Sequence, residues 1–294
     1  MSNMKDKLAE TRALMDGALD KLLPMPAGPE RRVVEAMRYS LLGGGKALRP
    51  FLVLSVADML GLDRKQAVPI ACALEMVHTY SLIHDDLPAM DNDTLRRGRP
   101  TNHVQFGEAT AILAGDGLLT QAFEVLADAP ALSADKKVKL IRALAAGAGA
   151  HGMIGGQMLD LLGEKTTLNR VEIERMQMMK TGALLRYACL AGAWAAGADT
   201  RTEEALTRYA DAIGLLFQIT DDLLDITGDN AVMGKTLGKD AAAGKSTFVS
   251  LMGMDGARQF AADLAARAKD ALAPFGAAAD ILREAADFIV ERKN

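Results

Sequence analysis

The sequence predicts an all-α protein, organised as a single domain over residues 1–294. Half of the 294 residues are apolar although only 4% are aromatic, and alanine and methionine are frequent, which is typical of helix-rich proteins. Apolar residues recur at helical spacing, whereas no segment alternates between apolar and polar residues for long. We therefore expect roughly ten or more helices joined by short loops.

Several helices are predicted, in chain order, by apolar residues that share one helical face. These faces comprise Leu8, Met15, Leu19 and Leu22; Val33, Met37 and Leu41; Ile112, Leu119, Phe123 and Leu126; and Leu206, Tyr209, Ile213 and Phe217. The helix breakers between them are "PMPAGP" at 24–29, "GGG" at 43–45, "RGRP" at 97–100, Pro130, Gly163 and "TGDN" at 227–230. No linker rich in Pro, Gly or Ser divides the chain, which favours one domain.

The bulk properties exclude several classes of function. A net charge of −4 argues against a surface that binds nucleic acid. The longest nearly apolar run, residues 187–198, is shorter than the about 20 residues that span a bilayer. The N-terminus is charged from Lys5 and lacks the apolar core of a secretory signal, and Cys72 and Cys189 have no metal-like spacing. The sequence predicts a cytoplasmic protein with reduced thiols and no membrane insertion.

Two aspartate clusters interrupt otherwise apolar helices. Pro88 disturbs the helix after Asp85, so that Asp91 can turn back toward Asp85. Asp221 and Asp225 lie four residues apart on one helix face, where their like charges repel unless a cation lies between them. One such cluster could equally be a solvated surface, but two within apolar helices favour carboxylate ligands of Mg²⁺ shared with substrate phosphates. Neither cluster has the pattern of a calcium-binding EF-hand loop.

Basic residues complement these carboxylates. "GGGKALRP" at 43–50 places Lys46 and Arg49 after three glycines, where backbone N–H groups and two cations can meet one anion. His78 shares the helix face of Asp85. Lys180, taken alone, would more often be a surface lysine.

The segment "GKDAAAGKST" at 238–247 ends like a nucleotide-binding P-loop. The P-loop pattern requires a glycine at position 239, which is occupied by Lys239. The segment is therefore not a P-loop. Lys235, Lys239 and Lys245 still follow closely after the second aspartate cluster, which favours a phosphate contact of another kind.

With these motifs assembled, the chain resembles the trans-isoprenyl diphosphate synthases, and most closely their bacterial farnesyl diphosphate branch. The resemblance covers nearly the whole chain, and it implies antiparallel helices around a deep central cavity and a cytoplasmic homodimer. The motifs that carry it are "YSLLGGGKALRP" at 39–50, "HDDLPAMDNDTLRRGRPT" at 84–101, "GMIGGQMLD" at 152–160, "KTGAL" at 180–184, "FQITDDLLD" at 217–225 and "GKST" at 244–247.

The resemblance also implies a role for individual residues. The metal ligands would be Asp85, Asp86, Asp91, Asp221, Asp222 and Asp225. They would hold about three Mg²⁺ ions per active site, with Mn²⁺ as a substitute. Isopentenyl diphosphate would be bound by Gly45, Lys46, Arg49, His78 and Arg97. The allylic diphosphate would be bound by Arg96, Lys180, Lys235 and Lys245, while Thr181 and Gln218 would face the developing cation.

The implied reaction condenses isopentenyl diphosphate with dimethylallyl or geranyl diphosphate to give farnesyl diphosphate and pyrophosphate. The two diphosphates repel each other, since each pair of unit charges at 4 Å costs about 4 kcal/mol at an effective dielectric near 20. Metal ions, lysines and arginines must cancel this repulsion. Because the allylic cation must be kept from water, we expect a deep apolar cavity and a closing loop around residues 228–245.

Tyr80 and Ser81 are the candidates for setting product length. Helix geometry leaves both open, since Tyr80 lies about 140° around the helix from Asp85, whereas Ser81 is nearer its face. The resemblance favours Tyr80, because an aromatic residue five positions before the first aspartate, together with "PA" inside the motif, resembles the farnesyl pattern. We therefore expect a C15 product.

Several alternatives remain. A geranylgeranyl or geranyl diphosphate synthase would share the same motifs. A class I terpene cyclase needs no second diphosphate site, so Lys46, Arg49 and His78 argue against it. A noncatalytic partner subunit would be expected to lose metal-binding aspartates, and both clusters are present. Ala47, Asn92 and Thr94 depart from the pattern of the family, but none replaces an implied metal ligand.

Overall fold

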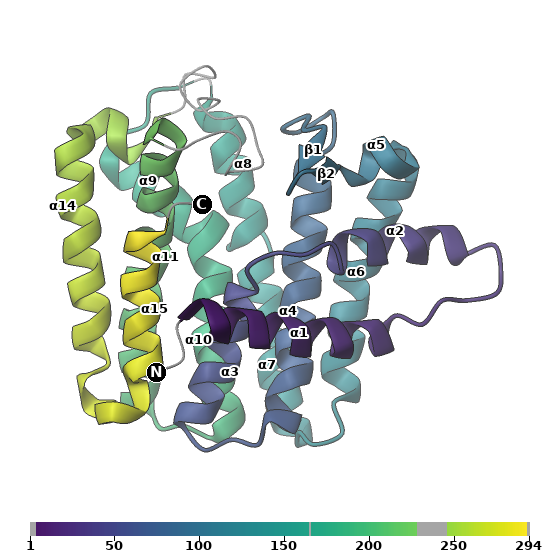
Figure 1. Cartoon of the computed structure of the whole chain (residues 1–294), viewed down its shortest axis with the longest axis horizontal. Helices are drawn as coiled ribbons and strands as arrows, with labels where there is room; N and C mark the ends of the chain where they lie inside the picture. Colours follow the sequence, from purple (N-terminus) through teal and green to yellow (C-terminus); the bar gives the residue numbers. More distant parts are fainter. Residues whose placement is uncertain (1–3, 165, 228–245, 293–294) are drawn as a thin grey trace. The chain divides into compact units, whose positions relative to one another are not determined.

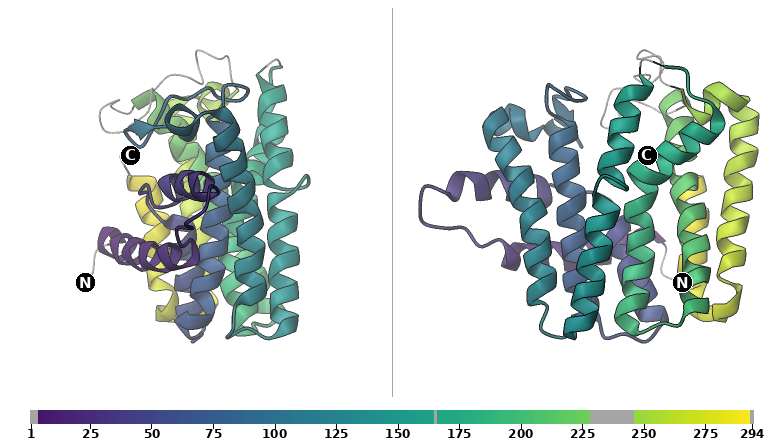
Figure 2. Two further views of the ribbon diagram at one scale, coloured as in Figure 1. Left: turned by 90° about the vertical axis from the view of Figure 1, so that its right-hand side faces the viewer. Right: turned by 180° about the vertical axis from the view of Figure 1, so that it is seen from behind.

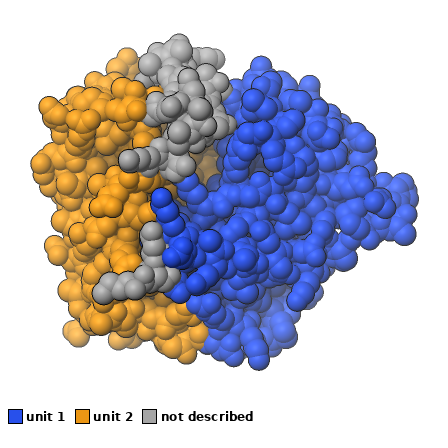
Figure 3. All heavy atoms as spheres, in the orientation of Figure 1, with its two compact units in different colours: residues 1–54, 63–141 blue, residues 55–62, 142–294 orange. Residues whose placement is uncertain are grey.

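The computed structural model describes residues 4–164, 166–227 and 246–292, and within them it is built almost entirely from helices (Figure 1). The chain divides into two compact units, residues 1–54 with 63–141 and residues 55–62 with 142–294 (Figure 3). Helices α3 (Leu48–Met59) and α7 (Ala134–Ala148) have residues in both units. The prediction of an all-α fold is confirmed, whereas the single domain stays a prediction.

The first unit is built around helix α4. The helices and strands that lie wholly within this unit are α1 (Met4–Leu22), α2 (Arg31–Leu41), α4 (Arg64–Asp85), β1 (Leu95–Arg96), β2 (Arg99–Pro100), α5 (Asn102–Phe106) and α6 (Glu108–Asp128). The side chain of Asp63 begins α4 by accepting a hydrogen bond from Lys65 N at 2.9 Å, and α4 is buried along most of its length. It runs beside α6, and α1 and α2 also contact it (Figures 1 and 2).

The apolar face predicted for α6 is only partly correct, since Leu126 is buried and Ile112 is not. Ile112 is 44% exposed, and Leu119 and Phe123 are only partly buried. The buried face of α6 instead carries mostly small residues, comprising Ala111, Ala114, Gly115, Leu118, Ala122 and Val125, with Leu126 beside them. A β-carbon at Gly115 would lie 2.5 Å from an atom of the His84 ring, so α6 approaches α4 closely only because its face is small. Large apolar residues are therefore a misleading guide to this face.

The other predicted faces are confirmed in their main members. Met15 and Leu19 of α1, Leu41 of α2, and Tyr209 and Ile213 of the second unit are 0–1% exposed. The remaining residues of these faces are buried or partly buried, namely Leu8, Leu22, Val33, Met37, Leu206 and Phe217. The predicted breakers up to Gly163 lie between helices or at their ends, and residues 228–230 of "TGDN" lie outside the described residues.

A small β-hairpin follows the first aspartate cluster, and it was not predicted. Residues 95–96 pair with residues 99–100 in antiparallel register. Arg97 and Gly98 form the two-residue turn, and both have positive φ angles, of 55° and 73°. Positive φ at both positions is the geometry of a type I′ turn, which matches the twist of a hairpin. The "RGRP" breaker therefore contains the turn and the second strand of this hairpin.

The second unit is centred on the long helix α11. The described helices that lie wholly within this unit are α8 (Met153–Gly163), α9 (Arg170–Gln177), the π-helical turn η1 (Met178–Gly182), α10 (Ala183–Ala196), α11 (Thr200–Thr227), α14 (Phe248–Ala271), the 3₁₀ segment η2 (Ala273–Ala279) and α15 (Asp280–Glu291). Helix α11 contacts α10, α14, α15 and η1 (Figure 2). The buried Tyr209 hydroxyl donates to Leu282 O at 2.8 Å. Within the described ranges, no helix has the length and apolarity needed to cross a membrane.

Candidate active site

The first aspartate cluster lies where α4 ends. Asp85 is the last residue of α4, and Asp86 follows as its C-terminal cap. The chain then turns at Pro88, so that Asp91 N donates to Asp85 O at 2.9 Å. This contact confirms the expectation that Asp91 turns back toward Asp85. Two carboxylate-bearing residues that are six positions apart are thereby joined through their backbones.

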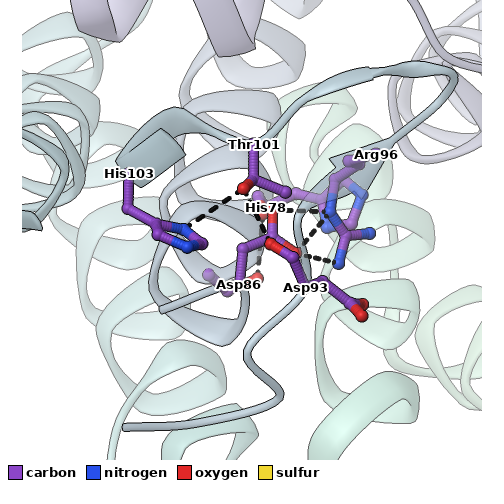
Figure 4. Close-up of polar contacts among 7 residues, drawn as sticks. His78, Asp86, Asp93, Arg96, Thr101 and His103 are labelled. Atoms are coloured by element: carbon purple, nitrogen blue, oxygen red, sulfur yellow. Dashed lines mark hydrogen bonds and ion pairs between the residues drawn. The ribbon is translucent and has the colours of Figure 1, made fainter. Parts of the chain in front are cut away.

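Asp86 is held by an arginine of the hairpin. Arg96 donates from both Nε and Nη2 to the Asp86 carboxylate at 2.7–2.9 Å, and Asp86 is 2% exposed (Figure 4). Burial raises the pKa of Asp86, and the Arg96 contact opposes that rise. Thr101 closes the loop by donating to Asp93 O at 2.7 Å, and its hydroxyl also contacts His103 Nδ1 at 3.2 Å. Arg96, implied as a ligand of the allylic diphosphate, thus already has a carboxylate partner.

His78 and Arg49 form a pair in the first unit. His78 Nε2 lies 3.2 Å from Arg49 Nη1. Because a guanidinium only donates, Nε2 must accept, which places the imidazole proton on Nδ1. Burial, and then the charges of Arg49 and Arg97, lower the pKa of His78 well below its ordinary value. His78 is therefore a neutral imidazole that orients Arg49 and can donate from Nδ1.

The glycine loop lies against the turn of the hairpin. Arg97 donates to Gly44 O, and Gly44 and Gly45 have φ angles of 91° and 135°. A β-carbon at Gly45 would lie 2.5 Å from a guanidinium nitrogen of Arg97. Glycine is therefore required here by both conformation and space. The structure brings together Gly45, Arg49, His78 and Arg97, four of the five residues implied to bind isopentenyl diphosphate, within one unit. Lys46 lies next to Gly45 in the same loop.

Glu75 is a buried residue that the sequence analysis missed. It is 4% exposed and lies one helical turn before His78. Burial raises the pKa of Glu75, whereas Arg49, Arg97 and Arg12 lower it. Its position within the apolar run "ACALEMV" at 71–77 is the feature of the sequence that indicates a buried carboxylate. Glu75 therefore interacts electrostatically with Arg49 and with Arg97 of the hairpin turn.

The second aspartate cluster lies near the end of α11. Asp222 is 4% exposed, and its two oxygens accept from Gln218 Nε2 at 3.1 Å and Phe248 N at 2.9 Å. Thr181 Oγ1 donates to Gln218 Oε1 at 3.5 Å, so that Gln218 links η1 to Asp222. Thr181, Gln218 and Asp222 are therefore brought together by hydrogen bonds. Asp225 lies one turn further along α11 and is partly buried.

Arg292, near the C-terminus, binds Asp221. It donates to Asp221 Oδ1 at 2.7 Å and to Phe217 O at 2.8 Å, and its guanidinium lies 4.0 Å from the centroid of the Phe217 ring. The Arg292 side chain is 3% exposed. Sequence reasoning gave no signal for this contact, because 71 residues separate Arg292 from Asp221.

Lys180 contacts a carboxylate that the sequence analysis did not assign. Its Nζ donates to Asp160 Oδ2 at 2.6 Å. Asp160 ends the motif "GMIGGQMLD", which carries the family resemblance but suggested no role for it. Lys235 and Lys245, and the closing loop expected around residues 228–245, lie outside the described residues.

The six aspartates have the chemistry that Mg²⁺ prefers. In the part of the chain that the structure describes, no group of three or more His, Cys, Asp or Glu side chains surrounds a common point. Mg²⁺ is usually held by one or two carboxylates together with substrate phosphates and water, rather than by a complete protein cage. Asp85 and Asp91 in the first unit fit a partial site of this kind, and so, separately, does the acidic turn of α11 in the second unit.

Comparisons with known proteins agree with these features. The polyprenyl synthetase family model matches residues 30–274. The chain is 45% identical over 298 residues to a farnesyl diphosphate synthase of Haemophilus influenzae, covering 100% of both chains. It is 44% identical over 296 residues to a geranylgeranyl diphosphate synthase of Cyanophora paradoxa, covering 99% of this chain and 97% of the other. Its structure is similar to that of an FPP/GFPP synthase from Zymomonas mobilis, with a TM-score of 0.89, 42% identity and 98% of both chains covered.

Proposed function

The chain belongs to the polyprenyl synthetase family, and from this premise we propose that it condenses isopentenyl diphosphate with dimethylallyl or geranyl diphosphate, giving farnesyl diphosphate and pyrophosphate. The observation that carries the proposal is the basic cluster of the first unit, in which Arg49 contacts His78 and Arg97 contacts the glycine loop. A terpene cyclase has no second diphosphate for such a cluster to bind, so the cluster favours a synthase.

The chain's own residues suggest how the reaction is supported. Arg49 and Arg97 bind the diphosphate of isopentenyl diphosphate, and neutral His78 keeps Arg49 oriented. Lys180 binds the allylic diphosphate. Asp85 with Asp91, and separately the cluster at 221–225, would hold Mg²⁺, which when bound would neutralise charge on the allylic diphosphate and make pyrophosphate a better leaving group. The hydroxyl of Thr181 and the amide of Gln218 face the positive charge that develops on the allylic carbon.

The proposed reaction balances without a further reagent. The C–O bond of the allylic diphosphate breaks, and pyrophosphate leaves with the electron pair. The double bond of isopentenyl diphosphate then forms the new C–C bond to the allylic carbon. One proton is lost from the resulting cation to the released pyrophosphate, which restores a double bond in the product.

Mass identification of the product tests the proposal. The enzyme is incubated with Mg²⁺, isopentenyl diphosphate and geranyl diphosphate, and C15 diphosphate and pyrophosphate are expected in equal amounts. A C20 product would instead support a geranylgeranyl synthase. Cyclised hydrocarbon from geranyl diphosphate alone would support a cyclase, and the absence of any product would support a noncatalytic subunit.

Loss of Arg49 is expected to weaken binding of one substrate. Arg49→Ala or Lys46→Ala should raise the KM for isopentenyl diphosphate roughly ten- to hundredfold, as expected for losing a charge-assisted hydrogen bond of about 1.5–3 kcal/mol. Steady-state kinetics with each substrate varied in turn measures the effect. Arg31→Ala, which removes an exposed arginine paired with Glu35, is the matched control and should leave both KM values unchanged. An equal rise in the KM for the allylic substrate would contradict separate diphosphate sites.

The protein is further proposed to be a cytoplasmic homodimer. Helix α6 exposes Ile112 and Leu113, which are 44% and 58% exposed. Helix α8 exposes Ile154, Met158 and Leu162 at i, i+4 and i+8, each about half exposed. Such apolar side chains are suited to contact a second copy of the chain.

Charge on the exposed apolar side chains of α6 is expected to separate the dimer. Leu113→Asp should shift the mass in light-scattering chromatography from twice 31.2 kDa toward 31.2 kDa, because an aspartate would be buried without a partner. Val171→Asp on α9, at a side chain that is 74% exposed, should leave the mass unchanged. A dimer that survives Leu113→Asp at micromolar concentration would exclude α6 from the interface.

A further inference from the structure

The turn that carries Lys180 is pressed against helix α8. A β-carbon at Gly156 would lie 2.5 Å from the Cα of Lys180 and 2.7 Å from the carbonyl carbon of Met179. Only glycine therefore allows this approach. The turn itself is π-helical, a geometry that is frequent at functional sites. The backbone from which the Lys180 side chain starts is thus fixed by its contact with α8.

Asp160 lies four residues after Gly156 and on the same face of α8. It is 8% exposed, and its Oδ2 receives the hydrogen bond from Lys180 Nζ at 2.6 Å. A carboxylate that is buried to this extent is costly unless it is paired. A lysine side chain, in turn, is long and flexible and loses considerable entropy when it is held in one place. The ion pair therefore fixes one position for the Lys180 ammonium.

The next residue of the same turn is held in a similar way. Thr181 donates to Gln218, and Gln218 donates to Asp222. Two adjacent residues of η1 thus have partners on two different helices, α8 and α11. Such an arrangement sets the orientation of the turn before any substrate binds.

We infer that Asp160 is a positioning residue of the allylic diphosphate site, which acts by holding the Lys180 ammonium. An ammonium has three N–H donors, and the bond to Asp160 uses one of them. The others remain chemically suited to phosphate oxygens. Asp160 itself would not touch the diphosphate, since like charges repel. The inference rests on the proposed role of Lys180.

A double-mutant cycle tests this inference. Asp160→Ala should raise the KM for geranyl diphosphate about tenfold, with the KM for isopentenyl diphosphate unchanged. In the background of Lys180→Met the same substitution should change the allylic KM less than about twofold, because the residue it acts through is absent. Asp160→Asn, which keeps an acceptor oxygen but not the charge, should give a smaller rise than Asp160→Ala. It also provides a readout if the alanine variant does not fold.

The controls distinguish this inference from the proposed function. Asp211→Asn removes one partner of the exposed Arg186–Asp211 ion pair on the same unit, and it should leave both KM values unchanged. If Lys180→Met leaves the allylic KM unchanged, the proposed role of Lys180 is wrong. If Lys180→Met raises it and neither Asp160 variant does, only the inference about Asp160 fails. Effects of Asp160→Ala and Lys180→Met that simply multiply would also overturn it, since Asp160 would then act independently.

Discussion

Replacing Asp85 with alanine is expected to lower kcat by roughly a thousandfold or more while the fold survives. Asp85 ends α4 and is joined to Asp91 through their backbones, so the substitution removes one carboxylate of the proposed Mg²⁺ site. It also relieves repulsion between neighbouring acidic side chains. The fold should therefore keep its thermal midpoint, as measured by circular dichroism.

The second aspartate cluster requires a different substitution. Asp221→Ala would leave the buried guanidinium of Arg292 without its carboxylate partner, which lowers stability as well as activity. Asp221→Asn keeps an acceptor for Arg292 while it removes the charge that a metal ion requires. This variant should lose turnover to a similar extent with little change in the thermal midpoint.

The measurement is the rate of product formation at saturating Mg²⁺ and saturating substrates. EDTA should silence the unmodified enzyme, and excess Mg²⁺ should restore it. Asp255→Ala is the matched control, because its side chain is fully exposed on α14 and its contact with Arg258 is weak. Near wild-type kcat in Asp85→Ala or Asp221→Asn would show that the metal assignment is wrong.

The helices were predictable because their signals are local. Apolar spacing located the buried faces of α1, α2 and α11, and Gly and Pro located most of the loops between helices. The exception is α6, whose packing against α4 depends on alanines and glycines that carry little apolar signal. The hairpin was missed because strands of two residues are too short to show alternation.

The motifs predicted which residues belong to the candidate site, but they did not predict the hydrogen-bond partners of those residues. Arg97 and Gly44 are 53 residues apart, and Asp222 and Phe248 are 26 apart. No spacing in the sequence indicates such contacts, because they depend on how helices pack. The same holds for Asp160 and Arg292, whose partners lie on other elements. Residue types at motif positions therefore suggest the chemistry, whereas the fold determines which charges are already paired.

Product length is the property expected to change most completely on a single substitution. Tyr80 lies in α4, one turn before His84, and it is 5% exposed. Its ring meets the His84 ring edge to face, with centroids 5.7 Å apart. The buried Tyr80 hydroxyl has no hydrogen-bond partner among the described residues. Burial, and then the charge of Asp85, raise the pKa of Tyr80 to about 12, so the phenol stays neutral.

A growing prenyl chain that runs from Asp85 alongside α4 would reach Tyr80 after little more than one helical turn, since a turn is about 5.4 Å long. Tyr80→Ala should therefore shift the product from C15 to C20 or longer, as read by mass spectrometry of the dephosphorylated alcohols. Tyr80→Phe is the matched control, because it keeps the ring and removes only the unpartnered hydroxyl, and it should still give C15. Because loss of a buried aromatic ring costs about 3–5 kcal/mol of stability, folding of the Tyr80→Ala variant must be confirmed.

Ser81→Ala should also give C15. A folded, active Tyr80→Ala variant that stops at C15 would show that another residue closes the cavity, and a longer product from Ser81→Ala would identify that position instead.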